Sequence, residues 1–395
     1  MGPMGPTKRI GQVALFFCLV VWHSGSANAQ FLLGSEFDTI LGPFDAEYLA
    51  SGGAALDEEA VRALAPTAAA IRAGVANEIA SLAISAAGTQ YFFGADRTFY
   101  VSGNLGSFFI EPPWTTGQGS WSLGLNVTPL DFEVFNDDRL DSLFDFSAYV
   151  PLTGQVERLL ESRYDLHGTL VTLCGTYGLT DRWDIGFVAP YVKLTGEGYW
   201  EYSFLGIPLA DFHETAEGIS DIVLRTKYEL YEVEDLNNLT TWSVGADVKL
   251  PTGDDDELLG TGDWGFRVRT LFGKRFGRIY PTVELAYYWA GVDAIESVYS
   301  PTRIKTGIDD NDFDALEFKA AIPVNLIEEK WTVSAEYLGR RYNHSSPDRT
   351  ASDIGISTRF KVLDSFFLHG GIRFPQDETG LRGKWISTFG GEIRF

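Results

Sequence analysis

The stretch that decides the fold is the last one: Lys384-Trp385-Ile386-Ser387-Thr388-Phe389-Gly390-Gly391-Glu392-Ile393-Arg394-Phe395. Counted back from Phe395, every second residue is mostly apolar, and the residues between them are mostly polar. A period of two residues is that of a β-strand with two different faces. We therefore predict that this stretch is a strand with one apolar and one polar face.

A strand of this kind that ends on an aromatic residue resembles the closing strand of Gram-negative outer-membrane β-barrels, whose final Phe is read by the barrel assembly machinery. The resemblance implies an assembly signal made of Phe395, Ile393 and Phe389. An edge strand of a soluble β-sandwich also alternates in this way. Taken alone, the strand leaves both folds open.

The beginning of the chain has the features of an export signal. Lys8 and Arg9 precede a short apolar run from Ile10 to Trp22, and Ala27-Asn28-Ala29 is a small-residue cleavage site. The apolar run is too short for a membrane-spanning helix, which needs about 20 residues. We predict a signal peptide over residues 1–29, cleaved after Ala29, and a location in the bacterial outer membrane.

The composition excludes several classes of partner. The chain has 395 residues and a formal net charge of −23, which argues against a nucleic-acid partner. Only Cys174 remains after the predicted cleavage, so no intrachain disulfide is possible. Aromatic residues make up 14% of the chain and the mean hydropathy is −0.04. These values suit a barrel whose outer surface is apolar and whose inner surface is polar and hydrated. No cofactor and no metal site is predicted.

Twelve segments between residue 118 and the end of the chain alternate between apolar and polar residues. The connections between them are long and short by turns, which is typical of outer-membrane barrels. We predict an all-β membrane protein, an antiparallel transmembrane β-barrel of about 12 strands over residues 118–395. The expected strands are 118–127, 162–178, 182–194, 218–231, 240–250, 262–276, 278–290, 312–323, 330–342, 351–361, 364–374 and 384–395.

Seven tryptophans fall at or near the ends of these expected strands. Aromatic girdles occupy the two membrane interfaces of such barrels, whereas a soluble protein would place the same side chains in its core. We predict that they form girdles. They are Trp121, Trp183, Trp242, Trp264, Trp289, Trp331 and Trp385.

Residues 30–117 follow a different pattern. Between Leu56 and Ala87, apolar residues from Val61 to Leu82 recur at steps of three or four, which predicts an amphipathic helix. Pro66 is expected to kink it near its start. The apolar stripe needs a partner, so this N-terminal helical segment is expected to plug the barrel, to lie on its periplasmic rim, or to self-associate.

Four motifs carry a more specific resemblance, to the family of outer-membrane barrel proteins named after the MetA pathway of phenol degradation. The resemblance covers roughly residues 85–395. It implies an outer-membrane channel or transporter for small molecules, with apolar or aromatic compounds as expected solutes. The motifs are Thr176-Tyr177-Gly178-Leu179-Thr180-Asp181-Arg182-Trp183-Asp184-Ile185-Gly186-Phe187-Val188-Ala189-Pro190-Tyr191-Val192, Gly218-Ile219-Ser220-Asp221-Ile222, Lys249-Leu250-Pro251-Thr252-Gly253-Asp254 and Leu259-Gly260-Thr261-Gly262-Asp263-Trp264.

Charged residues cluster on the polar faces of neighbouring strands. One interpretation is a polar pore lining that selects small solutes. The other is a network of ion pairs that fills a narrow lumen, because acids and bases alternate between adjacent strands. The candidate pore-lining residues are Arg225, Lys227, Asp247, Lys249, Arg267, Arg269, Glu284, Glu317, Lys319 and Glu336.

The long connections are acidic, as in Asp254-Asp255-Asp256-Glu257. The alternative function is therefore a non-conducting structural or interaction barrel that uses acidic extracellular loops as its working surface. Expected partners are outer-membrane lipid and lipopolysaccharide, the barrel assembly machinery and a small-molecule solute. Catalysis needs a nucleophile and a base, commonly His. His213 and His344 lie in predicted loops outside any barrel-enzyme motif, so no enzyme is predicted.

Overall fold

The computed structural model describes residues 105–135, 138–142, 146–150, 155–202, 207–235, 238–254, 259–290, 314–343, 350–377 and 381–395, with Glu257, two short strands at 91–93 and 99–101, and the helical residues Val75, Glu78, Ile79 and Leu82. The predicted signal peptide and its cleavage site lie outside these residues. Among the described residues, no helix is long and apolar enough to cross a membrane.

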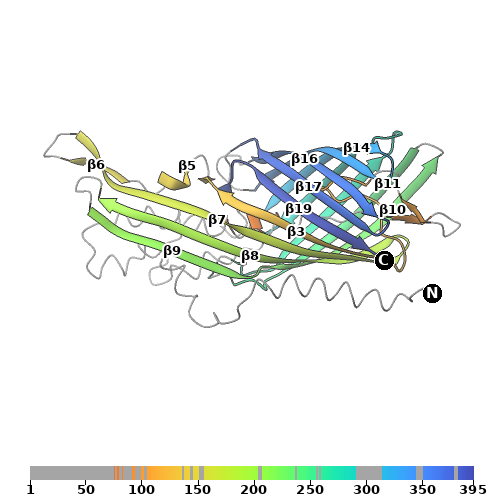
Figure 1. The fold of residues 1–395 in the computed structure, drawn as a ribbon, viewed down its shortest axis with the longest axis horizontal. Coiled ribbons are helices and arrows are strands. Elements are labelled where there is room, and N and C mark those ends of the chain that lie inside the picture. Colours follow the sequence, from red (N-terminus) through yellow and green to blue (C-terminus); the bar gives the residue numbers. More distant parts are fainter. Residues whose placement is uncertain are drawn as a thin grey trace.

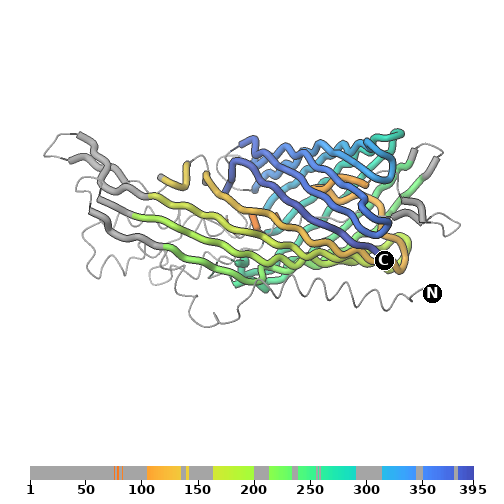
Figure 2. Tube along the Cα trace, in the orientation of Figure 1, coloured from red at the N-terminus to blue at the C-terminus, as the bar shows by residue number. Residues whose placement is uncertain are grey.

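Twelve antiparallel strands close into a barrel (Figure 1). Each strand pairs with its neighbours around the ring, which closes where the first strand lies beside the last (Figure 2). The strands are β3 (Trp121–Phe132), β7 (Gln155–Thr180), β8 (Trp183–Tyr202), β10 (Ile222–Asp235), β11 (Asn238–Leu250), β12 (Gly265–Lys274), β13 (Thr282–Trp289), β14 (Ala315–Ile327), β15 (Trp331–Tyr342), β16 (Thr350–Leu363), β17 (Phe366–Pro375) and β19 (Ile386–Arg394).

The strands of the ring correspond one to one to the twelve predicted segments, which confirms the predicted barrel. Closure follows from pairing between β19 and β3, with Phe389 opposite Val127. Beyond that register the Trp121 N–H donates to the Phe395 carbonyl at 2.8 Å, and the Phe395 N–H donates to the Trp121 carbonyl at 3.2 Å. The last residue of the chain is thus part of the seam.

The apolar faces of the strands point out of the barrel and the charged faces point in. On β12, Phe266, Val268 and Phe272 are 47 to 49% exposed, whereas Arg267 and Arg269 between them are at most 4% exposed. A soluble sandwich would bury the apolar face and expose the charged one. The alternation therefore belongs to a barrel with an apolar outer wall, and the sandwich interpretation is wrong.

All seven predicted girdle tryptophans are exposed on the outer surface. Three of them share a contact that the sequence did not predict, in which the indole N–H donates to a threonine hydroxyl on the next strand. The pairs are Trp183–Thr226 at 2.7 Å, Trp242–Thr270 at 2.8 Å and Trp331–Thr358 at 2.9 Å. The bond satisfies the polar end of a ring whose body stands on an apolar surface.

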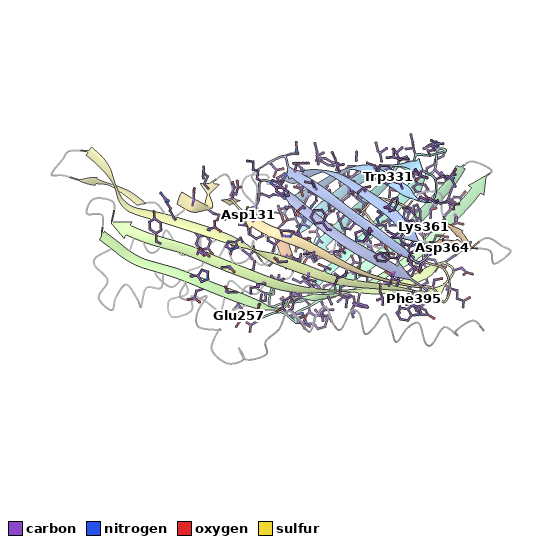
Figure 3. The ribbon with its side chains drawn as sticks, viewed as in Figure 1. Asp131, Glu257, Trp331, Lys361, Asp364 and Phe395 are labelled. Carbon is purple, nitrogen blue, oxygen red and sulfur yellow. The ribbon has the colours of Figure 1, made fainter. Side chains whose placement is uncertain are left out.

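The two ends of the barrel differ in the length of their connections. At one end, here called the short-turn end, tight turns join neighbouring strands, as at Asp364 between β16 and β17. Figure 3 places Asp364 and Phe395 at this end, and Asp131 and Glu257 toward the other, the long-loop end. The predicted asymmetry of the connections is present.

The largest difference from the sequence prediction lies at the long-loop end. Residues 128–161 and 195–217 were expected to be loops, but β7 begins at Gln155, β8 continues to Tyr202, and β9 (Ile207–Ile219) pairs with β8. β6 (Phe146–Val150) pairs with β7 in turn. These strands extend well beyond the barrel (Figure 1). These strands are longer than the about 9–11 residues that a membrane strand needs, and the prediction placed loops where the strands continue.

Pro190 explains how this extension joins the ring. A proline in mid-strand cannot donate to the ladder and suggests a bulge or an inward kink, but β8 keeps a regular register with β7 there, with Pro190 opposite Thr172. The irregularity lies on the other side of β8, where its partner changes from β9 to β10 across Ser220 and Asp221. The Pro190 carbonyl accepts from the Ser220 N–H at 2.9 Å. The missing proline N–H thus falls where the ladder is already interrupted.

Little of the predicted N-terminal helix lies within the described residues. Val75, Ile79 and Leu82, three members of its predicted apolar stripe, are helical and buried. Beyond Leu82, the described residues contain no α-helix. β1 (Tyr91–Phe93) pairs with β2 (Phe99–Val101). The remaining short elements are β4 (Val134–Phe135), β5 (Asp138–Arg139), β18 (Leu381–Arg382) and a 3-10 turn at Leu140–Ser142.

The contacts of Phe395 allow the predicted assembly signal to be tested separately from barrel closure. Its bonds to Trp121 use only the backbone, while its side chain is 50% exposed. We expect Phe395→Ala to lower the yield of protein in the outer membrane several-fold, and purified protein to refold in detergent like the wild type. Normal yield of Phe395→Ala, measured by membrane fractionation, would contradict the role predicted for Phe395, Ile393 and Phe389.

Candidate functional site in the barrel lumen

A segment that precedes β3, residues 105–117, lies inside the barrel and is here called the luminal segment. Leu105, Phe108 and Trp114 are each only 1% exposed. Pro112 and Pro113 interrupt it, which disfavours both a helix and a paired strand. Its backbone polar groups must therefore be satisfied by side chains that point inward from the barrel wall.

The first contacts of the luminal segment are with β15, β16 and β17. Glu336 accepts from the N–H groups of Phe108 at 3.1 Å and Phe109 at 2.9 Å. The Phe108 ring stacks on His369 with 4.7 Å between centroids. A Cβ at Gly371 would come within 2.6 Å of the Phe109 ring, so a glycine there makes room for this side chain.

Glu111 is the electrostatic centre of the luminal segment. Its carboxylate accepts from Arg225 Nη2 at 2.8 Å, lies 3.0 Å from Lys227 Nζ, and also pairs with Arg269. Burial raises the pKa of Glu111, but Arg269, Lys227 and Arg225 outweigh burial and hold that pKa well below its ordinary range. The carboxylate is therefore ionised at neutral pH and ties the segment to β10 and β12.

The segment then turns toward the short-turn end through Pro112, Pro113 and Trp114. Lys227 Nζ donates to the carbonyls of Pro112 at 3.1 Å and Trp114 at 2.5 Å. The Trp114 ring meets Tyr280 edge to face at 4.6 Å. Lys227 thus neutralises a carboxylate and satisfies two backbone carbonyls, which suits the three donors of an ammonium group.

The exit of the luminal segment is fixed by the hairpin of the longest family motif. Asp184 accepts from the Thr116 N–H at 2.9 Å and the Thr116 hydroxyl at 3.1 Å, and the Asp181 carbonyl accepts from the Thr115 hydroxyl at 2.6 Å. A Cβ at Gly178 would lie 1.9 Å from the Gly117 carbonyl oxygen, so the backbones meet too closely for any side chain. This motif is therefore an anchor for the segment.

A second group of inward charges forms ion pairs across the wall on β11 to β15 and is here called the wall network. Arg267 donates to Glu317 at 2.8 Å and to Asp247 at 3.1 Å, and also pairs with Glu284. Arg340 Nη2 lies 2.6 Å from Glu317, and Lys319 lies 3.4 Å from Glu284. The network thus comprises Asp247, Arg267, Glu284, Glu317, Lys319 and Arg340.

The other three family motifs meet at Asp221, at the long-loop end. Its carboxylate accepts from the N–H groups of Gly253 at 3.1 Å and Thr261 at 2.9 Å. Lys249 Nζ lies 3.9 Å from the carboxylate and donates to the Ala290 carbonyl at 2.6 Å. These contacts fix the connection between β11 and β12 against the wall, so these motifs have a structural explanation.

All ten candidate pore-lining residues point inward, but they do different things. Arg225, Lys227, Arg269 and Glu336 hold the luminal segment, Lys249 belongs to the Asp221 group, and the remaining five belong to the wall network. Their role in lining a pore stays a prediction. Of the two candidate histidines, His213 pairs with Glu197 at 2.9 Å on the surface, and His344 lies outside the described residues.

The luminal segment itself was missed. It lies within residues 30–117, the predicted N-terminal plug or periplasmic segment, but beyond the helix predicted over residues 56–87, and its apolar residues repeat at neither two nor 3.6 residues. Signals were present in the apolar run Phe108-Phe109-Ile110, the single acid Glu111 and the two prolines after it. Within the described ranges, no group of three His, Cys, Asp or Glu side chains is placed to hold a metal ion.

The depressed pKa of Glu111 predicts how pH acts on the docked segment. A carboxylate whose pKa is lower in the folded state stabilises it above the unfolded pKa, and that contribution is lost as pH falls through the folded pKa. We expect Glu111→Gln to destabilise the barrel by about 3 kcal/mol at neutral pH, as for loss of one partner of a buried pair. The difference should stay constant from about pH 8 to 5 and shrink below about pH 4.

Thermal unfolding of the wild type and of Glu111→Gln at several pH values measures this difference. Because both proteins share all other carboxylates, their titration cancels in the comparison. A difference that already shrinks between pH 8 and 5 would contradict the strongly paired state of Glu111.

An antiparallel barrel with an apolar outer wall, outward-facing tryptophans and a charged interior defines an outer-membrane-type β-barrel protein. The sequence comparison agrees. Residues 147–276 match the model of a family described as "Putative MetA-pathway of phenol degradation". The family resemblance predicted from the motifs is thereby confirmed over these residues. Among curated proteins no match was found.

Several solved structures are similar to this one. An outer membrane channel from Pseudomonas putida F1 is 12% identical, with a TM-score of 0.45 over 72% of this chain and 98% of that one. OccAB4 of Acinetobacter baumannii is 7% identical, with a TM-score of 0.31 over 71% and 98%. OccK11 (OpdR) of Pseudomonas aeruginosa is 7% identical, with a TM-score of 0.30 over 71% and 98%.

Proposed function

We propose that this protein is an outer-membrane channel or transporter for small molecules, and that the luminal segment is the constriction that solutes must pass. The observation that carries the proposal is the way the segment is held. Its backbone and its one acid are held by ionic and polar contacts, through Glu111, Asp184 and Glu336. Channels commonly build their constrictions from charged side chains and backbone carbonyls of this kind.

The family resemblance supports apolar or aromatic compounds as the solutes. The expected setting is the outer membrane, with lipid and lipopolysaccharide around the apolar wall and the assembly machinery reading the closing strand. Within residues 30–117, the plug is the expected arrangement that fits best, because the buried contacts of Leu105 to Thr116 are with the inner wall.

The second candidate, a non-conducting structural or interaction barrel, is favoured by a different observation. β7 has 26 residues, about 85 Å at the usual rise per residue, and most of that length exceeds what a membrane strand needs. The extension formed by β6 to β9 offers a surface beyond the barrel.

Current through planar bilayers separates the two candidates. The purified wild-type chain is expected to produce discrete steps of small conductance. Protein that inserts as a heat-modifiable barrel and yet carries no current, either intact or without residues 105–117, would favour the non-conducting alternative.

A further inference from the structure

The long-loop end of the lumen contains a pocket in which basic side chains outnumber acidic ones. The acids Glu317 and Asp353 stand on the barrel wall, and Glu78 comes from the N-terminal segment. The bases are Lys319, Arg340, Arg373 and Arg382. The pocket itself therefore carries an excess of positive charge.

Arg373 is the base of this pocket whose hydrogen-bond donors are not all paired with described residues. Its side chain is only 4% exposed, and its one ion pair with a described residue joins Nη1 to Asp353 at 3.4 Å. Its Nε and Nη2 atoms have no hydrogen-bond partner in the part of the chain that the structure describes. Phe109 of the luminal segment covers the guanidinium at 5.4 Å from its ring centroid. Unsatisfied donors on a buried charged group are costly, which indicates a site completed by a ligand.

The other bases of the pocket have close carboxylate partners. Arg340 lies 2.6 Å from Glu317, Arg382 lies 3.1 Å from Asp353, and Lys319 lies 3.4 Å from Glu284 of the wall network. These three bases add positive potential to the pocket, but each already contacts a carboxylate of the protein. A ligand is therefore expected to bind mainly through Arg373.

Glu78 shows that the pocket accommodates a carboxylate. It is 8% exposed and makes no ion pair within 4.0 Å with any described base. Burial raises the pKa of Glu78 above its ordinary value, although the charges of Arg382, Arg373 and Arg340 lower it in part. Glu78 thus lies in the field of these arginines without using the free donors of Arg373.

We propose that this pocket binds a small organic anion through its carboxylate, with Nε and Nη2 of Arg373 as the donors. This edge of a guanidinium group matches the two oxygens of a carboxylate. Leu338, Ala351 and Tyr342 also line the pocket and provide apolar surface beside the charge. The preferred ligand therefore joins a carboxylate to an apolar body. The inference rests on the proposed channel function, because the pocket lies in the lumen through which solutes would pass.

Isothermal titration calorimetry with benzoate tests the site on the purified full-length protein in detergent, and needs no conduction. The wild type is expected to bind benzoate, and benzyl alcohol, which has a similar body without the charge, is expected not to bind. Arg373→Gln should weaken benzoate binding by about tenfold or more, because it removes the charge-assisted bonds. Glu78→Gln should strengthen binding several-fold, because it removes a competing negative charge.

Arg139→Gln is the matched control, since Arg139 is 75% exposed and lies outside the lumen. Its benzoate affinity should equal that of the wild type. Misfolding cannot produce the stronger benzoate binding that is expected for Glu78→Gln. Heat-modifiable mobility on a gel checks that the Arg373→Gln variant is folded. Equal affinity of folded Arg373→Gln and wild type, or equal binding of benzyl alcohol and benzoate, would overturn the site. Benzoate binding by a barrel without conductance would support the site and count against the channel.

Discussion

Deletion of residues 105–117 should raise the single-channel conductance of the barrel about tenfold or more, because it removes the chain that fills the lumen. Barrels of 8 strands are filled by side chains alone, while those of 16–18 strands leave an aqueous channel. A ring of twelve strands lies between these cases. In this protein the interior is crossed by the luminal segment, whose Phe108 and Trp114 are bulky and fully buried. Removing it leaves the inward charges facing water.

Two variants make this measurement specific. Glu111→Gln releases only the centre of the segment and should give an intermediate increase in conductance. Glu217→Gln changes an exposed acid paired with Lys193 and should leave conductance unchanged. Unchanged conductance in the deletion variant, with normal heat-modifiable mobility, would show that the segment is not the constriction.

Replacement of Arg267 by Met should destabilise the barrel by about 3–5 kcal/mol, the usual cost of removing one partner from buried ion pairs. Arg267 is 2% exposed and is the only base in direct contact with all three of Asp247, Glu284 and Glu317 among the described residues. Without it, these carboxylates repel one another in a buried environment. Unfolding of the purified protein in urea, followed by tryptophan fluorescence, measures the loss.

Arg275→Met is the control for this substitution. Arg275 pairs at 3.7 Å with Glu328, which is 65% exposed, and surface pairs contribute only about 0–1 kcal/mol. The two variants remove the same charge and add the same side chain. Similar stability of the two would contradict the central place of Arg267 in the wall network.

The barrel could be predicted from the sequence because the rule that builds it is local. Each strand must present apolar residues to the outside and polar residues to the inside, and this alternation is written along every strand, as in Phe266-Arg267-Val268-Arg269. The extension of β7 to β9 was missed since alternation does not say where a membrane ends. The pairing of β9 with β8 depends on the break at Ser220 and Asp221, which no periodicity marks.

The site was predictable only in part. The sequence indicated that the inward charges of neighbouring strands are matched, and the cross-strand pairs of Asp247 with Arg267 and of Glu317 with Arg340 follow that pattern. The sequence carried composition signals of the luminal segment but did not indicate its partners, because these partners are remote in the chain. Leu105 bonds Thr332, 227 residues away, and Glu111 meets Arg269, 158 residues away. Such contacts leave no trace in a local pattern.

The permeability of liposomes that contain the intact protein tests the proposed channel most directly. Proteoliposomes made with the wild type should swell when small polar solutes are added, and those made with the barrel lacking residues 105–117 should swell faster. Liposomes with either protein that swell no faster than protein-free liposomes, although both proteins are inserted as folded barrels, would contradict a channel constricted by the luminal segment.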